Sequence, residues 1–188
     1  MMTYRAINLP SIELACSNKI FVSPSDYQRL LSQVEKEPIY VEISGFVFIA
    51  QSHPAVTEGI AMGKLIRKIC HISLIDSFEL KIFNSPLFYL GLMNIDVELP
   101  QIGPTIEISK RLLENAFREN MNDLVFNQNQ ILFLRFRNCP LLLTIWKVEG
   151  MNLINQEPQI ENFQCQRGIL HPQTLILFNT RSSNLCLY

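Results

Sequence analysis

Short hydrophobic runs with strand character recur along most of the chain, and in one of them apolar and polar residues alternate. In residues 78–83, Phe-Glu-Leu-Lys-Ile-Phe, the alternation has the period of two that a half-buried strand requires. Similar short runs, bounded by Gly, Pro, Ser or Asn, occupy residues 19–22, 40–43, 46–50 and 90–99. The pattern predicts a mainly β chain.

Residues 109–121 follow a helical period instead. Their apolar side chains recur at a spacing that places them on one helix face, namely Leu112, Leu113, Ala116, Phe117 and Met121. Ser109 is placed to cap the first turn of this helix. A shorter helix is expected at residues 26–34, with Ser25 as its cap. With these helices the predicted class is α+β.

After the long helix the pattern again predicts strands. Residues 131–136 and 141–148 form a predicted hairpin with a turn at residues 137–140. Residues 156–166 are polar and are expected to form a loose loop. Two further strands, connected to each other, are expected after it at residues 168–170 and 174–178. Strands that do not alternate regularly with helices argue against a doubly wound α/β enzyme.

A change in pattern at Asn84-Ser85-Pro86 marks the predicted domain boundary. A proline pushes the residue before it out of regular helix, and turn-forming residues surround this one. We therefore expect one subdomain over residues 1–84 and a second over residues 85–188.

Composition narrows the function classes. Sixteen Lys+Arg against seventeen Asp+Glu give a net charge of -1, so no overall field favours nucleic acid or an anionic membrane. The N-terminus resembles neither a signal peptide nor an anchor, and no apolar run reaches the length of a spanning helix. The five cysteines never form a C-x-x-C pair, which is typical of reduced cytosolic thiols rather than of disulfides or zinc ligands.

The stretch Glu-Gly-Ile-Ala-Met-Gly-Lys-Leu at residues 58–65 comes close to a phosphate-binding P-loop. Only three residues separate Gly59 from Gly63, however, and Leu65 stands where a hydroxyl must hold Mg²⁺. The flanking segments on both sides have strand character. We interpret the stretch as a strand interrupted by glycines, without nucleotide binding of its own.

No catalytic group of residues emerges from the sequence. His53 and His171 each precede a proline and read as turn residues, and His71 lies in a strand-like run. Asp96 and Glu98 read as part of a solvated strand face. Because no nucleophile–base pair or metal-ligand pattern is present, this segment is predicted to be neither an enzyme nor a holder of a metal or cofactor.

Three cations, Lys64, Arg67 and Lys68, fall within five residues of one another. In a nearly neutral chain this local excess is a candidate docking patch for an acidic partner. The alternative is that they are ordinary solvated side chains on a loop or strand edge.

Several motifs in order resemble the N-terminal domain of the N-ethylmaleimide-sensitive factor, the hexameric AAA ATPase of vesicle fusion. The matching segments are His53-Pro54-Ala55-Val56, Gly59-Ile60-Ala61, Arg67-Lys68, residues 78–83, residues 136–151 and Ser182-Ser183-Asn184-Leu185. This chain is one residue shorter than the family between Gly59 and Ile60. The likeness spans residues 13–188.

The resemblance implies a double-psi β-barrel for residues 1–84, followed by a smaller subdomain with a four-stranded β-barrel and one packed helix. It also implies that basic residues grip the adaptor SNAP on a SNARE bundle, which ATPase domains beyond Tyr188 then pull apart as a hexamer using ATP and Mg²⁺. The full-length protein is thus expected to be a cytoplasmic ATPase, peripheral to Golgi and vesicle membranes through its partners.

On this resemblance Arg67 and Lys68 are the matched adaptor-binding residues, with Lys64 beside them and Arg5 as the nearest substitute for an N-terminal arginine of the family. The family has two adjacent lysines after a strand that contains Ile-Asp, which matches Ile95-Asp96 here. In this chain Pro100 and Gln101 stand in place of those lysines. Lys64, with Lys110 and Arg111, offers compensating charge.

Two other functions remain open. A domain of the valosin-containing-protein type would bind ubiquitin-pathway adaptors on the same fold. A small enzyme on a double-psi barrel is the second alternative, because a fold does not fix a function.

Overall fold

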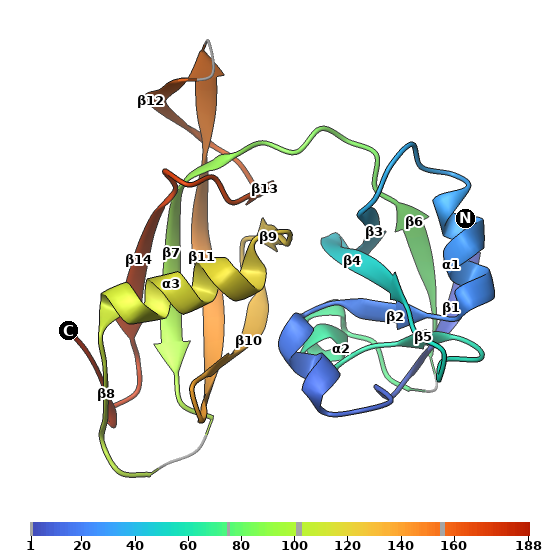
Figure 1. Cartoon of the computed structure of the whole chain (residues 1–188), viewed down its shortest axis with the longest axis horizontal. Helices are drawn as coiled ribbons and strands as arrows, with labels where there is room; N and C mark the ends of the chain where they lie inside the picture. Colours follow the sequence, from blue (N-terminus) through green and yellow to red (C-terminus); the bar gives the residue numbers. More distant parts are fainter. Residues whose placement is uncertain (1, 75, 101–102, 155–156) are drawn as a thin grey trace. The chain divides into compact units, whose positions relative to one another are not determined.

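The computed structural model describes residues 2–74, 76–100, 103–154 and 157–188 and is mainly β (Figure 1). The chain divides into two compact units, Met1–Pro86 and Leu87–Tyr188. None of the helices in the described part of the chain has the length and apolar character needed to cross a membrane.

The first unit is a closed barrel of six strands in the order β1-β5-β2-β4-β3-β6. Their bounds are β1 Met2–Ile7, β2 Ile20–Val22, β3 Ile39–Ile43, β4 Phe46–Ser52, β5 Ile60–Ala61 and β6 Ser77–Ile82. The pairs β1–β5 and β2–β4 are parallel and the others antiparallel. Pairing of Tyr4 with Phe78 helps to join β6 back to β1, so the barrel leaves no free edge.

Alternating side chains fill this barrel, as the sequence predicts. In β6, Phe78 and Leu80 are buried whereas Glu79 and Lys81 are exposed. The turn between β3 and β4 uses Ser44 and Gly45, both with positive φ, which a tight hairpin demands. The strands expected at residues 40–43, 46–50 and 78–83 are thus confirmed.

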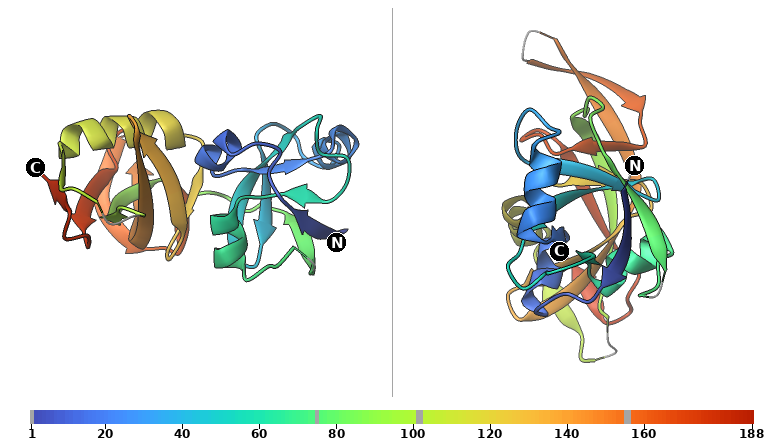
Figure 2. Two further views of the ribbon diagram at one scale, coloured as in Figure 1. Left: turned by 90° about the horizontal axis from the view of Figure 1, so that it is seen from below. Right: turned by 90° about the vertical axis from the view of Figure 1, so that its right-hand side faces the viewer.

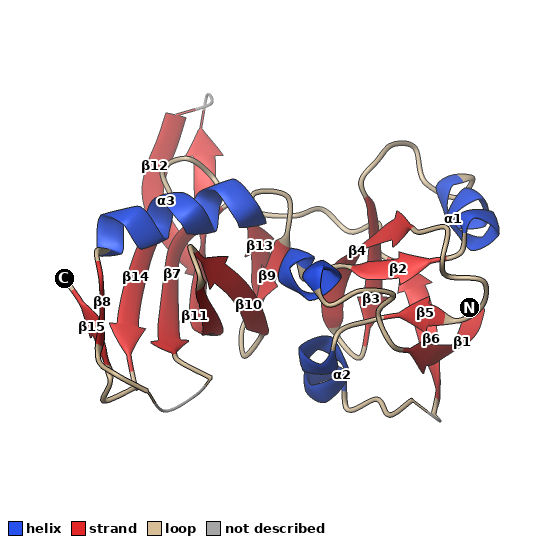
Figure 3. Cartoon of the chain, turned by 60° about the horizontal axis from the view of Figure 1, so that its bottom comes forward, coloured by secondary structure: helices blue, strands red, loops and turns tan. Residues whose placement is uncertain are grey.

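Three short helices complete the first unit: η1 Glu13–Ser17, α1 Pro24–Leu31 and α2 Lys64–Cys70 (Figure 3). The cap of α1 is Ser23 rather than Ser25, because Pro24 occupies the first helical turn and the Ser23 hydroxyl accepts a hydrogen bond from the Asp26 amide at 3.1 Å. The short helix expected at residues 26–34 is therefore present, but it begins at Pro24 and ends at Leu31.

The expectation of strand or loop around residues 64–71 is wrong, because this segment forms α2. Ile66 and Cys70, four positions apart, are buried against the barrel, and this is the spacing of one helix face. His71 ends the helix in the left-handed conformation at φ 55°. The dense apolar composition of the segment hides its helical period.

The second unit is built around an open sheet in the order β10-β11-β7-β14, with β12 pairing to β11. Its strands are β7 Leu90–Glu98, β8 Ile106–Ile108, β9 Val125–Asn127, β10 Ile131–Phe136, β11 Cys139–Ile154, β12 Glu157–Gln164, β13 Arg167–Ile169, β14 Leu175–Thr180 and β15 Leu185–Leu187. The helix α3, Lys110–Met121, lies across one face of this sheet (Figure 2).

Packing of α3 follows most of the predicted face, but Leu112, which was expected on it, is 44% exposed. Leu113, Phe117 and Met121 are buried, and the Phe117 ring stands edge-on to Phe178 of β14 at 6.0 Å between centroids. Ser109 takes the N-cap position, but its side chain makes no capping hydrogen bond. The helix predicted at residues 109–121 is therefore confirmed without its predicted cap bond.

Two expectations for the second unit need correction. The described residues form an open four-strand path where a four-stranded barrel was expected, since β10 and β14 remain its two edges. The strands expected at residues 168–170 and 174–178 are present as β13 and β14, which pair with β9 and β7, respectively. The segment expected as a loose loop contains β12; residues 155–156 lie outside the described residues.

Candidate functional site

The three clustered cations lie on one face of α2. Lys64, Arg67 and Lys68 are spaced i, i+3 and i+4, so their side chains are neighbours on the helix surface. The opposite face holds Ile66 and Cys70 in the barrel core. We call Lys64, Arg67 and Lys68 the α2 cation face. A helix, rather than a strand edge, therefore brings these residues together.

The side chains of the α2 cation face differ in exposure. Lys64 and Lys68 are exposed and Arg67 is half-buried. No ion pair is recorded between any of the three and an acidic residue of the described chain. Because their charge is not cancelled locally, it remains available to a negatively charged partner.

Their position along the helix also bears on their role. Arg67 and Lys68 lie in the last turn, where the helix macrodipole favours positive charge. Lys64 opens the helix, where a cation is unfavourable, and the preceding Gly63 offers no side-chain cap. The presence of Lys64 is therefore not explained by helix stability.

The side chain of Arg67 makes one hydrogen bond to another described residue. Its Nη2 donates to Oδ1 of Asn8 at 3.2 Å, and its Nε is buried without a hydrogen-bond partner. Asn8 follows β1, far from Arg67 in the sequence, and no sequence pattern points to this contact.

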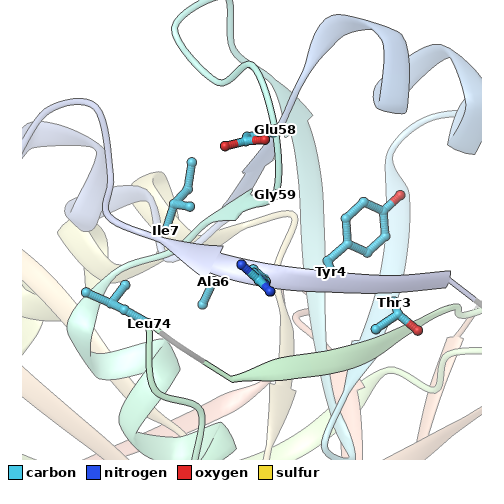
Figure 4. A pocket seen from close by; sticks show the side chains of 8 residues that line it. Thr3, Tyr4, Ala6, Ile7, Glu58, Gly59 and Leu74 are labelled. Carbon is cyan, nitrogen blue, oxygen red and sulfur yellow. The ribbon is translucent and has the colours of Figure 1, made fainter.

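Arg5 lies on β1 and is exposed. It lines a hollow of about 480 Å³ together with Glu58, Ile7 and Leu74 (Figure 4). The carboxylate of Glu58 places a negative charge in the same hollow. No hydrogen bond or ion pair in the described part of the chain joins Arg5 to the α2 cation face, so the structure brings together three of the four predicted residues.

The P-loop-like stretch has a structural role. Gly59 has φ +70°, and a Cβ atom there would lie 2.7 Å from the carbonyl oxygen of Arg5. Only glycine permits this approach of the chain to β1. Ile60 and Ala61 then form β5, and Gly63 leads into α2. The glycines thus serve strand packing and the entry to a helix.

Two of the histidines act within turns, as predicted. The Nδ1 atom of His53 accepts a hydrogen bond from the Ala55 amide at 3.2 Å, and Nδ1 of His171 accepts one from the Gln173 amide at 3.3 Å. His71 lies at the C-terminal cap of α2 and not in a strand, as its surroundings in the sequence suggested. No group of three His, Cys, Asp or Glu side chains suited to a metal ion occurs among the described residues.

Asp96 is not on a solvated face, contrary to the sequence-based expectation. Asp96 is 4% exposed, and the Nε atom of Arg181 lies 2.7 Å from Oδ2 of Asp96. The pair is an ion contact without hydrogen-bond alignment, since Oδ2 has no hydrogen-bond partner among the described residues. A buried carboxylate needs a countercharge, and Arg181 supplies it.

The two positions that the resemblance aligns with a lysine pair, Pro100 and Gln101, carry no charge. Pro100 is exposed after the end of β7, and Gln101 lies outside the described residues. Lys110 and Arg111 begin α3 in the second unit and are exposed.

Comparison with known proteins gives a distant similarity. No protein-family profile matches this chain. The chain is similar to the vesicle-fusing ATPase of Arabidopsis thaliana, with 22% identity over 189 aligned positions. The alignment covers 98% of this chain and 24% of that protein, so the chain spans about a quarter of its relative's length.

Proposed function

We propose that this chain is the adaptor-binding N-terminal domain of a hexameric AAA ATPase that disassembles SNARE complexes. The α2 cation face holds the acidic surface of a SNAP adaptor. The observation that carries this proposal is the set of three cations on one helix face without an acidic partner in the described residues.

Similarity to a vesicle-fusing ATPase over nearly the whole chain supports the proposed context. In this proposal the chain itself is not catalytic, and ATP and Mg²⁺ bind to ATPase domains elsewhere in the full-length protein. Those domains form the hexamer. The protein is cytoplasmic and reaches Golgi and vesicle membranes through the adaptor and SNARE proteins.

The proposal includes a double-psi arrangement for the first unit. Its support is the strand pairing: β1–β5 and β2–β4 are parallel pairs inside an otherwise antiparallel barrel. Parallel neighbours require connections that cross the barrel, because a tight hairpin cannot join them. Two such crossings are what a double-psi barrel needs.

Within the site, Arg67 and Lys68 are the main adaptor contacts and Lys64 extends them. Arg5 contributes least, since Glu58 shares its hollow. Charge steers such an encounter and fixes its register, so binding must weaken as salt is added.

The test is binding of the 188-residue chain to recombinant SNAP on an assembled SNARE bundle, measured at two salt concentrations. We expect Arg67→Glu/Lys68→Glu to weaken binding at least about tenfold and to flatten the salt dependence. Circular dichroism checks that the variant remains folded.

A matched variant, Lys36→Glu/Lys81→Glu, introduces the same charge change at two exposed positions outside the α2 cation face. Parent-like binding of this variant supports the α2 assignment. An equal loss in both variants, or no loss in the α2 variant, overturns it. Binding to ubiquitin-pathway adaptors in place of SNAP would overturn the proposed partner.

A further inference from the structure

The three residues of the α2 cation face are not equivalent in their freedom of movement. Lys64 and Lys68 are exposed ammonium groups at the ends of flexible chains. Arg67 is half-buried, and Asn8 fixes one end of its guanidinium group at 3.2 Å. A planar group held on one side presents its remaining donors in a defined direction.

Asn8 is itself held by the barrel. It directly follows β1, whose last residue, Ile7, pairs with Ala61 of β5. The carbonyl oxygen of Ile7 also accepts a hydrogen bond from the Met62 amide at 3.2 Å. Two backbone attachments next to Asn8 thus tie it to the segment that leads directly into α2.

The contacts divide the guanidinium group into two sides. Nη2 donates to Asn8, and Nε beside it is buried without an acceptor. The Nε side therefore faces the protein. The end formed by Nη1 and Nη2 retains donors without a hydrogen-bond partner among the described residues, and this end can bind a carboxylate through two parallel hydrogen bonds.

The chemical nature of Asn8 matters for the charge. A carboxamide oxygen orients a guanidinium group without neutralising it, whereas a carboxylate at the same place would pair with it. Asn8 therefore directs Arg67 and leaves its positive charge available to a partner.

We infer that Asn8 is a positioning residue that orients Arg67 to bind a carboxylate of an acidic partner segment through Nη1 and Nη2. Lys64 and Lys68 act beside it as less directional charges. This inference rests on the proposed function only in naming the adaptor as the source of the carboxylate.

The first test measures affinity for SNAP on a SNARE bundle with Asn8→Ala and Asn8→Asp. Loss of one orienting hydrogen bond is expected to weaken binding about three- to tenfold in Asn8→Ala. Asn8→Asp is expected to weaken it about tenfold or more, because the new carboxylate competes for Arg67.

A double-mutant cycle separates positioning from a general structural effect. The loss caused by Asn8→Ala is expected to vanish in an Arg67→Ala background and to persist in a Lys68→Ala background. An equal loss in both backgrounds, or no loss in the parent, overturns the inference. Parent-like folding of Asn8→Ala is checked by thermal unfolding.

Two readouts distinguish failure of this inference from failure of the proposed function. The NMR signal of the Arg67 Nε–H in the free chain should show faster hydrogen exchange in Asn8→Ala, and a hexaglutamate peptide serves as a second acidic probe. Asn8-dependent binding of the peptide without binding of SNAP overturns the adaptor but retains the inference. An unchanged Nε–H signal, or no binding of either probe, overturns the inference that Asn8 positions Arg67.

Discussion

Arg67 on α2 and Arg118 on α3 are both half-buried helical arginines, yet their surroundings differ. Among the described residues, the side chain of Arg67 has one hydrogen bond, to Asn8, and no acidic partner. Arg118 has four side-chain hydrogen bonds: its Nε and Nη2 donate to Glu114, and its Nη1 and Nη2 donate to the carbonyl oxygens of His171 and Thr174, respectively.

This difference separates two uses of one residue type. Arg118 joins α3 to the turn before β14 and belongs to the architecture of its unit. Arg67 holds unused donors at the surface of the barrel, which is what recognition of a carboxylate requires. The number of basic residues is a weaker guide to a binding surface than the count of donors that the fold leaves unpaired.

The largest effect is expected at the inner face of α2, where the helix is packed into the barrel. Burial raises the pKa of the Cys70 thiol from 9.0 to about 12. Such a shift lowers the thiolate fraction about a thousandfold, and the thiolate is the reactive form. At pH 8 a soluble thiol reagent should modify the exposed Cys186 rapidly and Cys70 only after unfolding.

The sign of the pH dependence follows from the same shift. The protonated thiol is favoured in the folded chain, so its stabilising effect is complete below pH 9.0 and decreases as the pH rises toward about 12. Mass spectrometry of the labelled cysteines provides the measurement. Rapid labelling of Cys70 in the folded chain would show that α2 is not held by the barrel.

The second prediction compares the contributions of Arg118 and Arg67 to the free energy of unfolding. Arg118→Ala is expected to lower the free energy of unfolding by about 2–3 kcal/mol, because it removes hydrogen bonds to a charged group. Arg67→Ala should change it by no more than about 0.5 kcal/mol. Urea unfolding of both variants gives the comparison, and similar losses would abolish the distinction between them.

A smaller loss is expected at the buried carboxylate. Arg181→Ala leaves Asp96 without its countercharge and should cost about 1–2 kcal/mol of unfolding free energy. Adding Asp96→Asn to this variant should restore part of the loss, since a neutral amide is less costly to bury. Arg181 also lies over the ring of Trp146 at 5.9 Å, so the fluorescence of the single tryptophan reports the change. No recovery in the double variant would contradict the pairing.

The smallest effects are expected from single lysines. Lys64→Ala and Lys68→Ala should each weaken binding to an acidic partner about two- to fivefold and leave stability unchanged within about 0.5 kcal/mol. Lys81→Ala on β6, at an exposed position outside the α2 cation face, serves as the matched control. Equal losses in all three variants would show that the partner senses overall charge rather than the α2 cation face.

Local patterns in the sequence were sufficient for much of the fold. The alternation in residues 78–83 and the helical spacing of Leu113 and Phe117 each determine which side is buried, and both predictions hold. The helix α2 was missed because Leu65, Ile66 and Ile69 make its composition resemble a strand. Its length of seven residues offers too little period to decide.

Non-local contacts could not be predicted in this way. The burial of Asp96 depends on Arg181, and the partner of β14 is β7, in each case far away in the sequence. The cations of the candidate site were visible as a cluster, but their common face depends on α2 being a helix. Asn8 carried no signal at all, because its role appears only where the end of β1 meets α2.

The close approach at Gly59 has a consequence for genetic experiments. A methyl group at this position would press on the backbone of Arg5, three residues before Asn8 on the same extended segment. A random-mutagenesis screen for impaired binding of an acidic partner should therefore recover alleles at Gly59, although this residue has neither a charge nor a side chain with which to contact that partner.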